Sequence, residues 1–229
     1  MKGYPSPTRV YRVGRAGAPW DLADWKYGPF NGRFDDPDAA YRVRYVALTR
    51  VGAFIERLAK NRPDLDALAT MAEIAATTPV AVPTLPREWL DENEVGTAEI
   101  DVPHDNGLVD LATGEGMAAA HLAIDAACRR AGYILKDYDA SVLLSGTPRA
   151  FTQAISRYVF DSGFAGIVYR SRYAPDELCV ALFEGRHRLT STDVTTIVVD
   201  DPDLARGCAI HHLAFATPAA RNTDDADDG

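Results

Sequence analysis

The chain has 229 residues, enough for one large domain, and its hydrophobic content of 47% is ordinary for a soluble globular protein. Acidic residues outnumber basic ones by 33 to 24, which gives a formal net charge of −9. This balance argues against a nonspecific nucleic-acid binder, because phosphate backbones are held by an excess of Lys and Arg. It does not exclude a small anionic ligand, because a local arginine cluster can bind one whatever the global charge.

Cysteine usage and the N-terminus indicate a reduced setting away from membranes. The 3 cysteines, Cys128, Cys179 and Cys208, are far apart and form no CxxC pair, so we expect buried thiols rather than a zinc site or disulfides. The first residues lack the apolar core of a signal peptide, and no stretch approaches the roughly 20 apolar residues of a membrane span. We therefore expect a cytoplasmic protein that contacts neither membrane nor nucleic acid directly.

Apolar spacing in the first half of the chain predicts a strand followed by a helix. Over residues 41–48, Tyr41, Val43 and Tyr45 share one face of the expected strand. Thr49 suits a helix N-cap. The apolar residues that follow at helical spacing, in a helix expected to end near residue 61, are Val51, Phe54, Ile55 and Leu58. The other expectations are an ordered loop at 1–40 with a short strand at 8–13, a second helix at 64–76 and a loop-rich stretch at 77–116.

The second half is predicted to begin with helices and to continue as strands. The expected helices cover 117–131, closed by Gly132 as a C-cap, and 148–160. Strands are expected at 166–171, 177–184 and 194–199, with a weaker fourth at 207–215. Because the elements interleave without βαβ regularity, we expect a mixed α/β (α+β) fold with a central mixed β-sheet surrounded by helices. The expected organisation is a main domain at 1–190, a C-terminal strand extension packed on it at 191–216, and an acidic, disordered tail at 217–229.

Several familiar catalytic motifs are absent from the sequence. No GxGxxG, GxxxxGK[ST], GxSxG or HExxH pattern occurs, which removes support for hydride transfer, ATP hydrolysis and metal-dependent hydrolysis. The 5 histidines lie on separate elements except for His211 and His212, which would face opposite sides of the expected strand. We therefore expect no metal site.

Five residues remain as candidates for chemistry: Arg12, Arg33, Tyr45, Glu56 and Ser171. Taken singly, each has an ordinary structural explanation. The arginines would be surface residues, Tyr45 a core residue and Ser171 a strand-end residue. Glu56 lies off the centre of its helix's apolar stripe, so it could border a cleft or simply pair with Lys60 at i+4.

Taken together and in order, these residues lie in motifs that resemble the RES-domain family, named for its Arg, Glu and Ser. The matching segments are VYRV (10–13), GRFDDP (32–37), YRVRYVA (41–47), GAFIERLA (52–59), GIVYRSR (166–172) and ELCVALFEG (177–185). The resemblance implies an ADP-ribosyltransferase-like fold and cleavage of the nicotinamide–ribose bond of NAD, by hydrolysis or with inorganic phosphate as acceptor. It also implies a toxin paired with an Xre-type antitoxin. NAD is then a substrate rather than a cofactor, and no metal is needed.

The resemblance assigns a role to each of the five residues. Arg12 and Arg33 fall on the family's arginines, and arginine forks suit the pyrophosphate of NAD or an acceptor phosphate. Glu56 falls on the Glu, where a carboxylate stabilises an oxocarbenium-like ribose. Tyr45 would stack on nicotinamide, and Ser171 would hydrogen-bond the carboxamide or the ribose. The expected catalytic residues are thus Glu56, Arg33 and Tyr45, and the expected NAD-binding residues are Arg12, Arg33, Tyr45 and Ser171.

Two departures and two alternatives accompany this interpretation. Val13 follows Arg12 where the family has a second aromatic, and the chain extends about 40 residues past ELCVALFEG. That extension could form a surface for a second copy of the chain or for an antitoxin. The alternatives are a transferase that attaches ADP-ribose to a macromolecule, and a catalytically inactive nucleotide-binding or interaction domain of the same fold.

Overall fold

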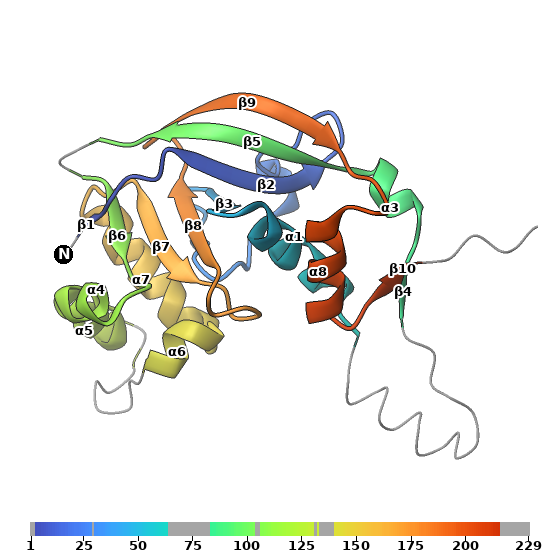
Figure 1. The fold of residues 1–229 in the computed structure, drawn as a ribbon. Helices are drawn as coiled ribbons and strands as arrows, with labels where there is room; N and C mark the ends of the chain where they lie inside the picture. The colour runs from blue at the N-terminus through green and yellow to red at the C-terminus, as the bar shows by residue number, and fades with distance from the viewer. Residues whose placement is uncertain are drawn as a thin grey trace, which may run out of the picture.

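A computed structural model describes residues 3–28, 30–63, 83–103, 106–130, 132 and 140–215 of the chain. Its centre is an eight-stranded sheet in the order β1-β6-β7-β8-β3-β2-β5-β9, around which the helices pack (Figure 1). Strands β6 and β7 pair in parallel and the other neighbours pair antiparallel. The expected mixed sheet surrounded by helices is therefore confirmed. The helix expected at 64–76 and the tail at 217–229 lie outside the described residues.

The strand bounds confirm most of the predicted strands. In chain order the sheet contains β1 (Gly3–Tyr4), β2 (Arg9–Arg15), β3 (Val43–Ala47), β5 (Asn93–Asp101), β6 (Leu108–Asp110), β7 (Gly166–Arg170), β8 (Leu178–Phe183) and β9 (Arg188–Thr196). A separate parallel pair joins β4 (Thr84–Leu85) to β10 (Ala214–Phe215). The structure thus has strands where 8–13, 41–48, 166–171 and 177–184 were predicted, while β9 begins and ends earlier than the expected 194–199.

The helices form two groups on the sheet. Near β6 and β7 lie α4 (Gly114–Ala119), α5 (His121–Arg130), α6 (Ala140–Ser145) and α7 (Arg149–Asp161). At the other end α1 (Arg50–Leu58) and α8 (Pro202–Ile210) lie side by side (Figure 1). The described residues also form three short helices: η1 (Trp25–Tyr27), η2 (Ala59–Asn61) and α3 (Glu88–Asp91). No helix of the described residues is both long and apolar enough to cross a membrane.

Helix α1 is held between the sheet and α8. Thr49 caps it as predicted, because its Oγ1 accepts the Gly52 N–H at 3.0 Å. Phe54 and Leu58 are fully buried in the main core cluster, together with Leu204 of α8. The two helices approach closely at Gly207, where an added Cβ would lie 3.0 Å from Leu58 Cδ1. This packing fixes the helix that carries Glu56.

Two predictions about the fold are wrong. The described part of the stretch 77–116, which is 83–103 and 106–116, is not mainly loop, because it contains the nine-residue strand β5 between β2 and β9 as well as β4, α3, β6 and the start of α4. The stretch 207–215 is not a strand: it holds the end of helix α8 and then the two-residue strand β10. Asp201 caps α8 by accepting from the Asp203 and Leu204 N–H groups, and Pro202 occupies its first turn. The described part of the extension, 191–215, therefore contains the end of β9, helix α8 and strand β10 rather than strands alone.

Candidate active site

A cleft of about 580 Å³ opens beside α1, a volume within the ~300–1,000 Å³ typical of small-molecule sites. Arg12, Arg33, Tyr45 and Glu56 all line it, although they come from β2, a loop, β3 and α1. The structure thus brings four of the five predicted site residues to one surface. Ser171 is fully buried and does not line the cleft, but its hydroxyl contacts the Glu56 carboxylate.

A tight turn at residues 32–35 presents Arg33 to the cleft. The Asp35 carboxylate accepts the Gly32 N–H at 2.5 Å and the Tyr45 hydroxyl at 2.9 Å. The same hydroxyl accepts the Phe34 N–H at 2.9 Å, so Tyr45 and Asp35 lock the turn from two sides. A Cβ on Gly32 would lie 2.6 Å from both Asp35 Oδ2 and the Tyr45 hydroxyl, so any larger residue there would have to displace these two groups.

Burial around this turn shifts two pKa values. Burial raises the pKa of the Asp35 carboxyl, against the Gly32 and Tyr45 hydrogen bonds that lower it. Burial also raises the pKa of Tyr45 well above its ordinary value, so its hydroxyl stays protonated and can donate to Asp35. The hydroxyl of Tyr45 is therefore occupied by the turn, and its ring is the part that faces a ligand in the cleft.

Arg33 is a buried cation without a carboxylate partner. Arg33 is only 9% exposed, and its Nη1 donates to the Arg170 carbonyl at 3.0 Å. The guanidinium lies 4.8 Å from the Tyr169 ring centroid and 5.1 Å from that of Phe34. Its Nε is buried with no hydrogen-bond partner, and no carboxylate of a described residue pairs with it.

The isolation of Arg33 has an electrostatic consequence. Burial lowers the pKa of the guanidinium, although Tyr169 and Glu56 act in the opposite direction. A buried cation with an unused donor is costly unless another group satisfies it. An anion in the cleft could supply the missing negative charge.

Glu56 is oriented by Ser171. The Ser171 hydroxyl donates to Glu56 Oε1 at 2.6 Å, and its oxygen accepts the Tyr173 and Ala174 N–H groups at 3.2 and 3.4 Å. The alternative pairing of Glu56 with Lys60 is not present in the structure. Among the described residues, Oε2 of Glu56 takes no hydrogen bond, so it is available to a ligand.

The position of Ser171 changes its expected role. Direct contact with the carboxamide or the ribose was expected, but Ser171 is 0% exposed and its proton is given to Glu56. The backbone explains this geometry: Ser171 N–H donates to the Glu177 carbonyl at 2.9 Å, which turns the chain back toward β8. Ser171 therefore acts on the cleft through Glu56.

Arg12 and Arg57 form a second group of cations. Arg12 Nη1 donates to the Asp21 carbonyl at 2.9 Å. Burial, together with the charges of Arg44 and Arg57, lowers the pKa of Arg12 to about 10. Arg57 is fixed by the Asn93 side chain, whose Oδ1 accepts from Nε at 2.9 Å and from Nη2 at 2.7 Å. Sequence reasoning missed Arg57, although it directly follows Glu56.

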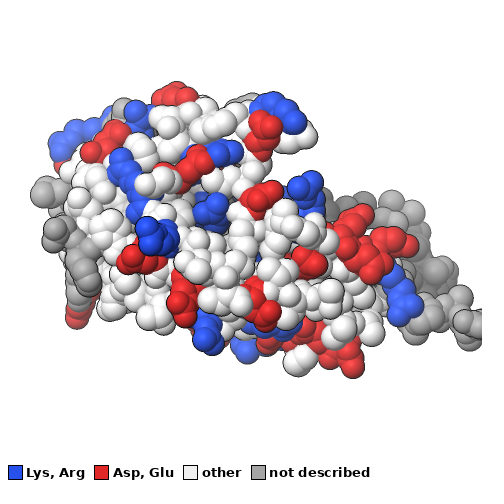
Figure 2. All heavy atoms as spheres, turned by 90° about the horizontal axis from the view of Figure 1, so that it is seen from above, with Lys and Arg blue, Asp and Glu red and all other residues white. Residues whose placement is uncertain are grey.

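The cleft is strongly basic although the whole chain carries −9. Its cationic lining residues are Arg12, Arg33, Arg42, Arg57, Lys60, Arg149 and Arg172. Against these seven stand two carboxylates, Asp35 and Glu56. On the face seen in Figure 2, acidic and basic side chains are interspersed. Of the seven cations, Lys60 and Arg149 make no side-chain hydrogen bond or ion pair with any described residue. The cleft is thus suited to an anionic ligand.

Metal ligands and reactive thiols do not contribute to this cleft. Among the residues that the structure describes, no cluster of three or more His, Cys, Asp or Glu side chains is arranged to hold a metal ion. Cys179 and Cys208 are free and buried, as expected for structural thiols. Burial raises the pKa of both, so neither is an activated thiolate.

Comparison with known proteins gives the family. A family model described as RES domain matches residues 9–206. One similar solved chain comes from the M. tuberculosis MbcT–MbcA toxin–antitoxin complex, with 16% sequence identity, 89% of this chain and 88% of that chain covered, and a TM-score of 0.49. A search of curated proteins finds no match. Because the family match spans most of the sequence and contains all five candidate residues, this chain belongs to the RES-domain family.

Proposed function

We propose that this protein degrades NAD by cleaving the bond between nicotinamide and ribose, with inorganic phosphate or water as acceptor. One observation carries the proposal: the carboxylate of Glu56, held by Ser171, shares a basic cleft with Arg33, a buried guanidinium that pairs with no carboxylate of the described residues. Dinucleotides supply what this arrangement lacks, namely a negatively charged pyrophosphate and a ribose that becomes cationic during the reaction.

Glu56 has the chemistry that the bond cleavage requires. When the C–N bond breaks, its electron pair moves to the positively charged nicotinamide ring, which leaves as a neutral molecule. No proton donor to the leaving group is needed. The ribose develops oxocarbenium character, and a carboxylate close to it lowers the barrier. Phosphate or water then attacks the same carbon; water loses its proton to solvent.

The arginines have the complementary task of binding. Guanidinium forks bind phosphate oxygens in pairs and stay charged in the cell, so Arg33 and Arg12 suit the pyrophosphate or an acceptor phosphate. The ring of Tyr45 lies in the cleft lining while its hydroxyl is held by Asp35, so it offers a fixed surface for nicotinamide. Water is excluded where such a ring covers the reacting bond.

The biological role that fits this activity is that of a toxin. Loss of NAD is harmful to any cell, so a partner that blocks the cleft is required, and we propose an Xre-type antitoxin. Expression of the wild type should stop growth, and expression of Glu56→Gln should not. Growth should return when an Xre-type protein encoded beside the gene is coexpressed. Equal toxicity of the wild type and of Glu56→Gln would refute the enzymatic explanation of toxicity.

The proposed activity is tested by nicotinamide release from NAD. Purified wild type, Glu56→Gln and Glu99→Gln are compared with and without inorganic phosphate. Glu99 is an exposed carboxylate of β5 outside the cleft, so Glu99→Gln is the matched control. We expect release by the wild type and by the control but not by Glu56→Gln. Release that requires phosphate identifies a phosphorylase, and release without it a glycohydrolase. Transfer of label from NAD to protein or nucleic acid would identify the ADP-ribosyltransferase alternative.

A further inference from the structure

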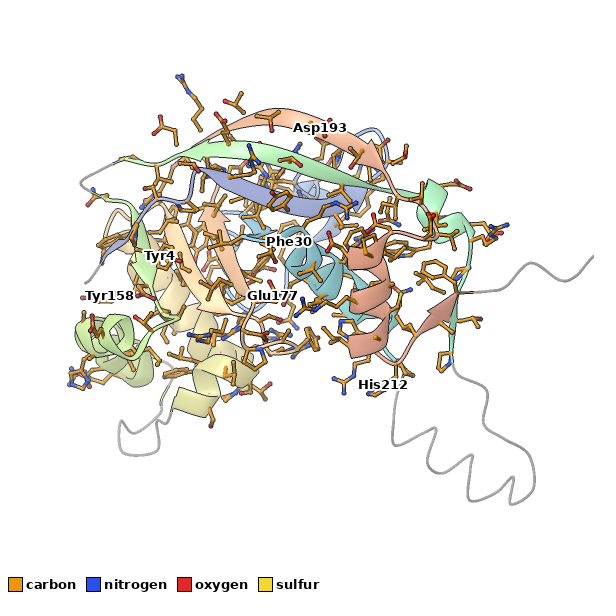
Figure 3. All side chains as sticks on the ribbon, viewed as in Figure 1. Tyr4, Phe30, Tyr158, Glu177, Asp193 and His212 are labelled. Atoms are coloured by element: carbon orange, nitrogen blue, oxygen red, sulfur yellow. The ribbon has the colours of Figure 1, made fainter. Side chains whose placement is uncertain are left out.

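A buried histidine contacts the helix that carries Glu56. His211 follows the last residue of α8 and is only 1% exposed. Its Nε2 lies 2.7 Å from the carbonyl oxygen of Ile55, the residue before Glu56 in α1. A carbonyl oxygen can only accept, so Nε2 carries the proton and donates. His212, the next residue, is exposed and lies at the end of α8 (Figure 3).

The acceptor belongs to the last turn of α1. The short helix η2 continues directly from α1, so the Ile55 carbonyl lies inside a continuous helical run, and its oxygen has a second lone pair that accepts from the imidazole. Ile55 is also fully buried, so water does not satisfy this carbonyl. The imidazole of His211 therefore adds a buried hydrogen bond that ties the last turn of α1 to the end of α8.

The same ring contacts the second element that holds Glu56. The His211 and Tyr173 rings meet edge to face with centroids 5.0 Å apart. The Tyr173 N–H donates to Ser171 Oγ, which in turn donates to Glu56. His211 thus touches both supports of the carboxylate: the backbone just before it and the turn whose serine orients it.

The opposite end of α1 is fixed in a comparable way. Glu177 accepts the Thr49 hydroxyl, and Thr49 Oγ1 accepts the Gly52 N–H. Figure 3 shows Glu177 close to the start of α1. Glu177 and His211 are both buried, and each makes a hydrogen bond near one end of α1. Only His211, however, acts on the turn that contains Glu56.

The surroundings favour the neutral imidazole. Burial lowers the pKa of His211, and this effect outweighs the Ile55 hydrogen bond, which raises it. The positive charges of Arg62 and His212 lower the pKa further. A neutral ring protonated at Nε2 is the form that the contact with Ile55 requires.

We propose that His211 is a positioning residue for the reaction: its Nε2–H donates to the Ile55 carbonyl, and this hydrogen bond, beside the packing of the ring on Tyr173, is the contact that fixes the Glu56 carboxylate in the cleft. The inference rests on the proposed NAD cleavage. It extends the site to a residue beyond the segment 9–206 that matches the family. It also gives helix α8 a role in activity, because the helix places this ring beside α1.

The test separates the hydrogen bond from the ring. His211→Phe keeps a ring against Tyr173 and loses the donor, whereas His211→Gln keeps an N–H donor and loses the ring. Because a displacement of about 1 Å at a reacting group can cost up to about 100-fold in rate, we expect kcat of His211→Phe to fall by about 10- to 100-fold. Its KM should change less than about threefold, because the arginines that bind the anion are untouched. His211→Gln should keep most of the wild-type kcat.

Circular dichroism at the assay temperature establishes that each variant is folded. If His211→Phe does not fold, His211→Met replaces it with the same expectation. A wild-type kcat in the donor-free variant, an equal loss in His211→Phe and His211→Gln, or failure of both donor-free variants to fold would overturn the positioning role. Absence of nicotinamide release by the wild type would instead refute the proposed function, and with it this inference.

Discussion

Replacing Ser171 by Ala removes one hydrogen bond from the proposed catalytic carboxylate. Ser171 is fully buried, and its hydroxyl donates to Glu56 Oε1 at 2.6 Å. Alanine is smaller by a single oxygen and introduces no clash, so the change is confined to this contact and to the two N–H groups that the oxygen accepts. Glu56 keeps its charge but loses the donor that sets its direction.

The size of the effect follows from the type of hydrogen bond. A hydrogen bond to a charged group contributes about 1.5–3 kcal/mol. Since about 1.4 kcal/mol corresponds to a tenfold change in rate, kcat should fall by about 10- to 150-fold if the contact acts fully in the transition state. The N–H groups of Tyr173 and Ala174 also lose an acceptor, so unfolding free energy should fall by about 1–3 kcal/mol.

The assay measures kcat and KM for nicotinamide release, with the melting temperature as a control for folding. Because Ser171 acts through Glu56, the effects of the two substitutions on kcat should not be additive. In the Glu56→Gln background, Ser171→Ala should have little further effect on activity. A folded Ser171→Ala variant with wild-type kcat would refute the reasoning and leave Ser171 a purely structural residue. Additive losses in the double variant would show that Ser171 acts independently of Glu56.

Three further predictions concern the residues around this contact. Arg33→Ala should raise KM for NAD by about 10-fold or more, because the proposed anion loses a guanidinium of the cleft; an unchanged KM in a folded variant would remove Arg33 from anion binding. Tyr45→Phe should destabilise the turn by about 1–3 kcal/mol, because Asp35 loses a donor in a buried setting; an equal melting temperature would contradict this. The hydrogen bond from Arg42 lowers the pKa of Glu184, so the carboxylate stabilises the fold only while it is ionised. At pH values above about 5, Glu184→Gln should therefore have a slightly lower melting temperature than the wild type, and this difference should vanish as the pH falls through the lowered pKa. A difference that does not depend on pH would be inconsistent with the ion pair.

The sequence predicts those elements in which the local signals, such as caps and apolar spacing, agree with the packing of the whole fold. Helix α1 has a capping Thr49 and an apolar stripe at helical spacing, and both of these features match the structure. Strand β5 was missed because its sequence, NEVGTAEID, mixes charged and small residues and follows several prolines. Its identity as a strand depends on pairing with β2 and β9 on either side, which no local pattern reports.

Helix α8 shows a different failure. The apolar residues near 207–215 suggest a strand, but Asp201 and Pro202 carry a helix start signal that precedes them. Attention to this N-cap and first-turn proline would have predicted the helix. The burial of His211 could not have been predicted in this way, because it depends on how closely α8 packs against α1.

The site shows the same division between residue identity and geometry. Motif order identified Arg12, Arg33, Tyr45 and Glu56, and these four residues line one cleft. The sequence could not show that Ser171 is buried beneath Glu56, because that contact joins residues 115 positions apart. Basic residues from several elements, such as Arg149 on α7, likewise become neighbours only through the tertiary fold.

The central claim is that Glu56 and the basic cleft cleave NAD. Its most direct test is nicotinamide release by folded wild type and Glu56→Gln, each with and without inorganic phosphate. Release by the wild type, with a loss of at least about 100-fold in Glu56→Gln, is the predicted result. Comparable release by both proteins, or no release by a wild type that is folded and binds NAD, would contradict the claim.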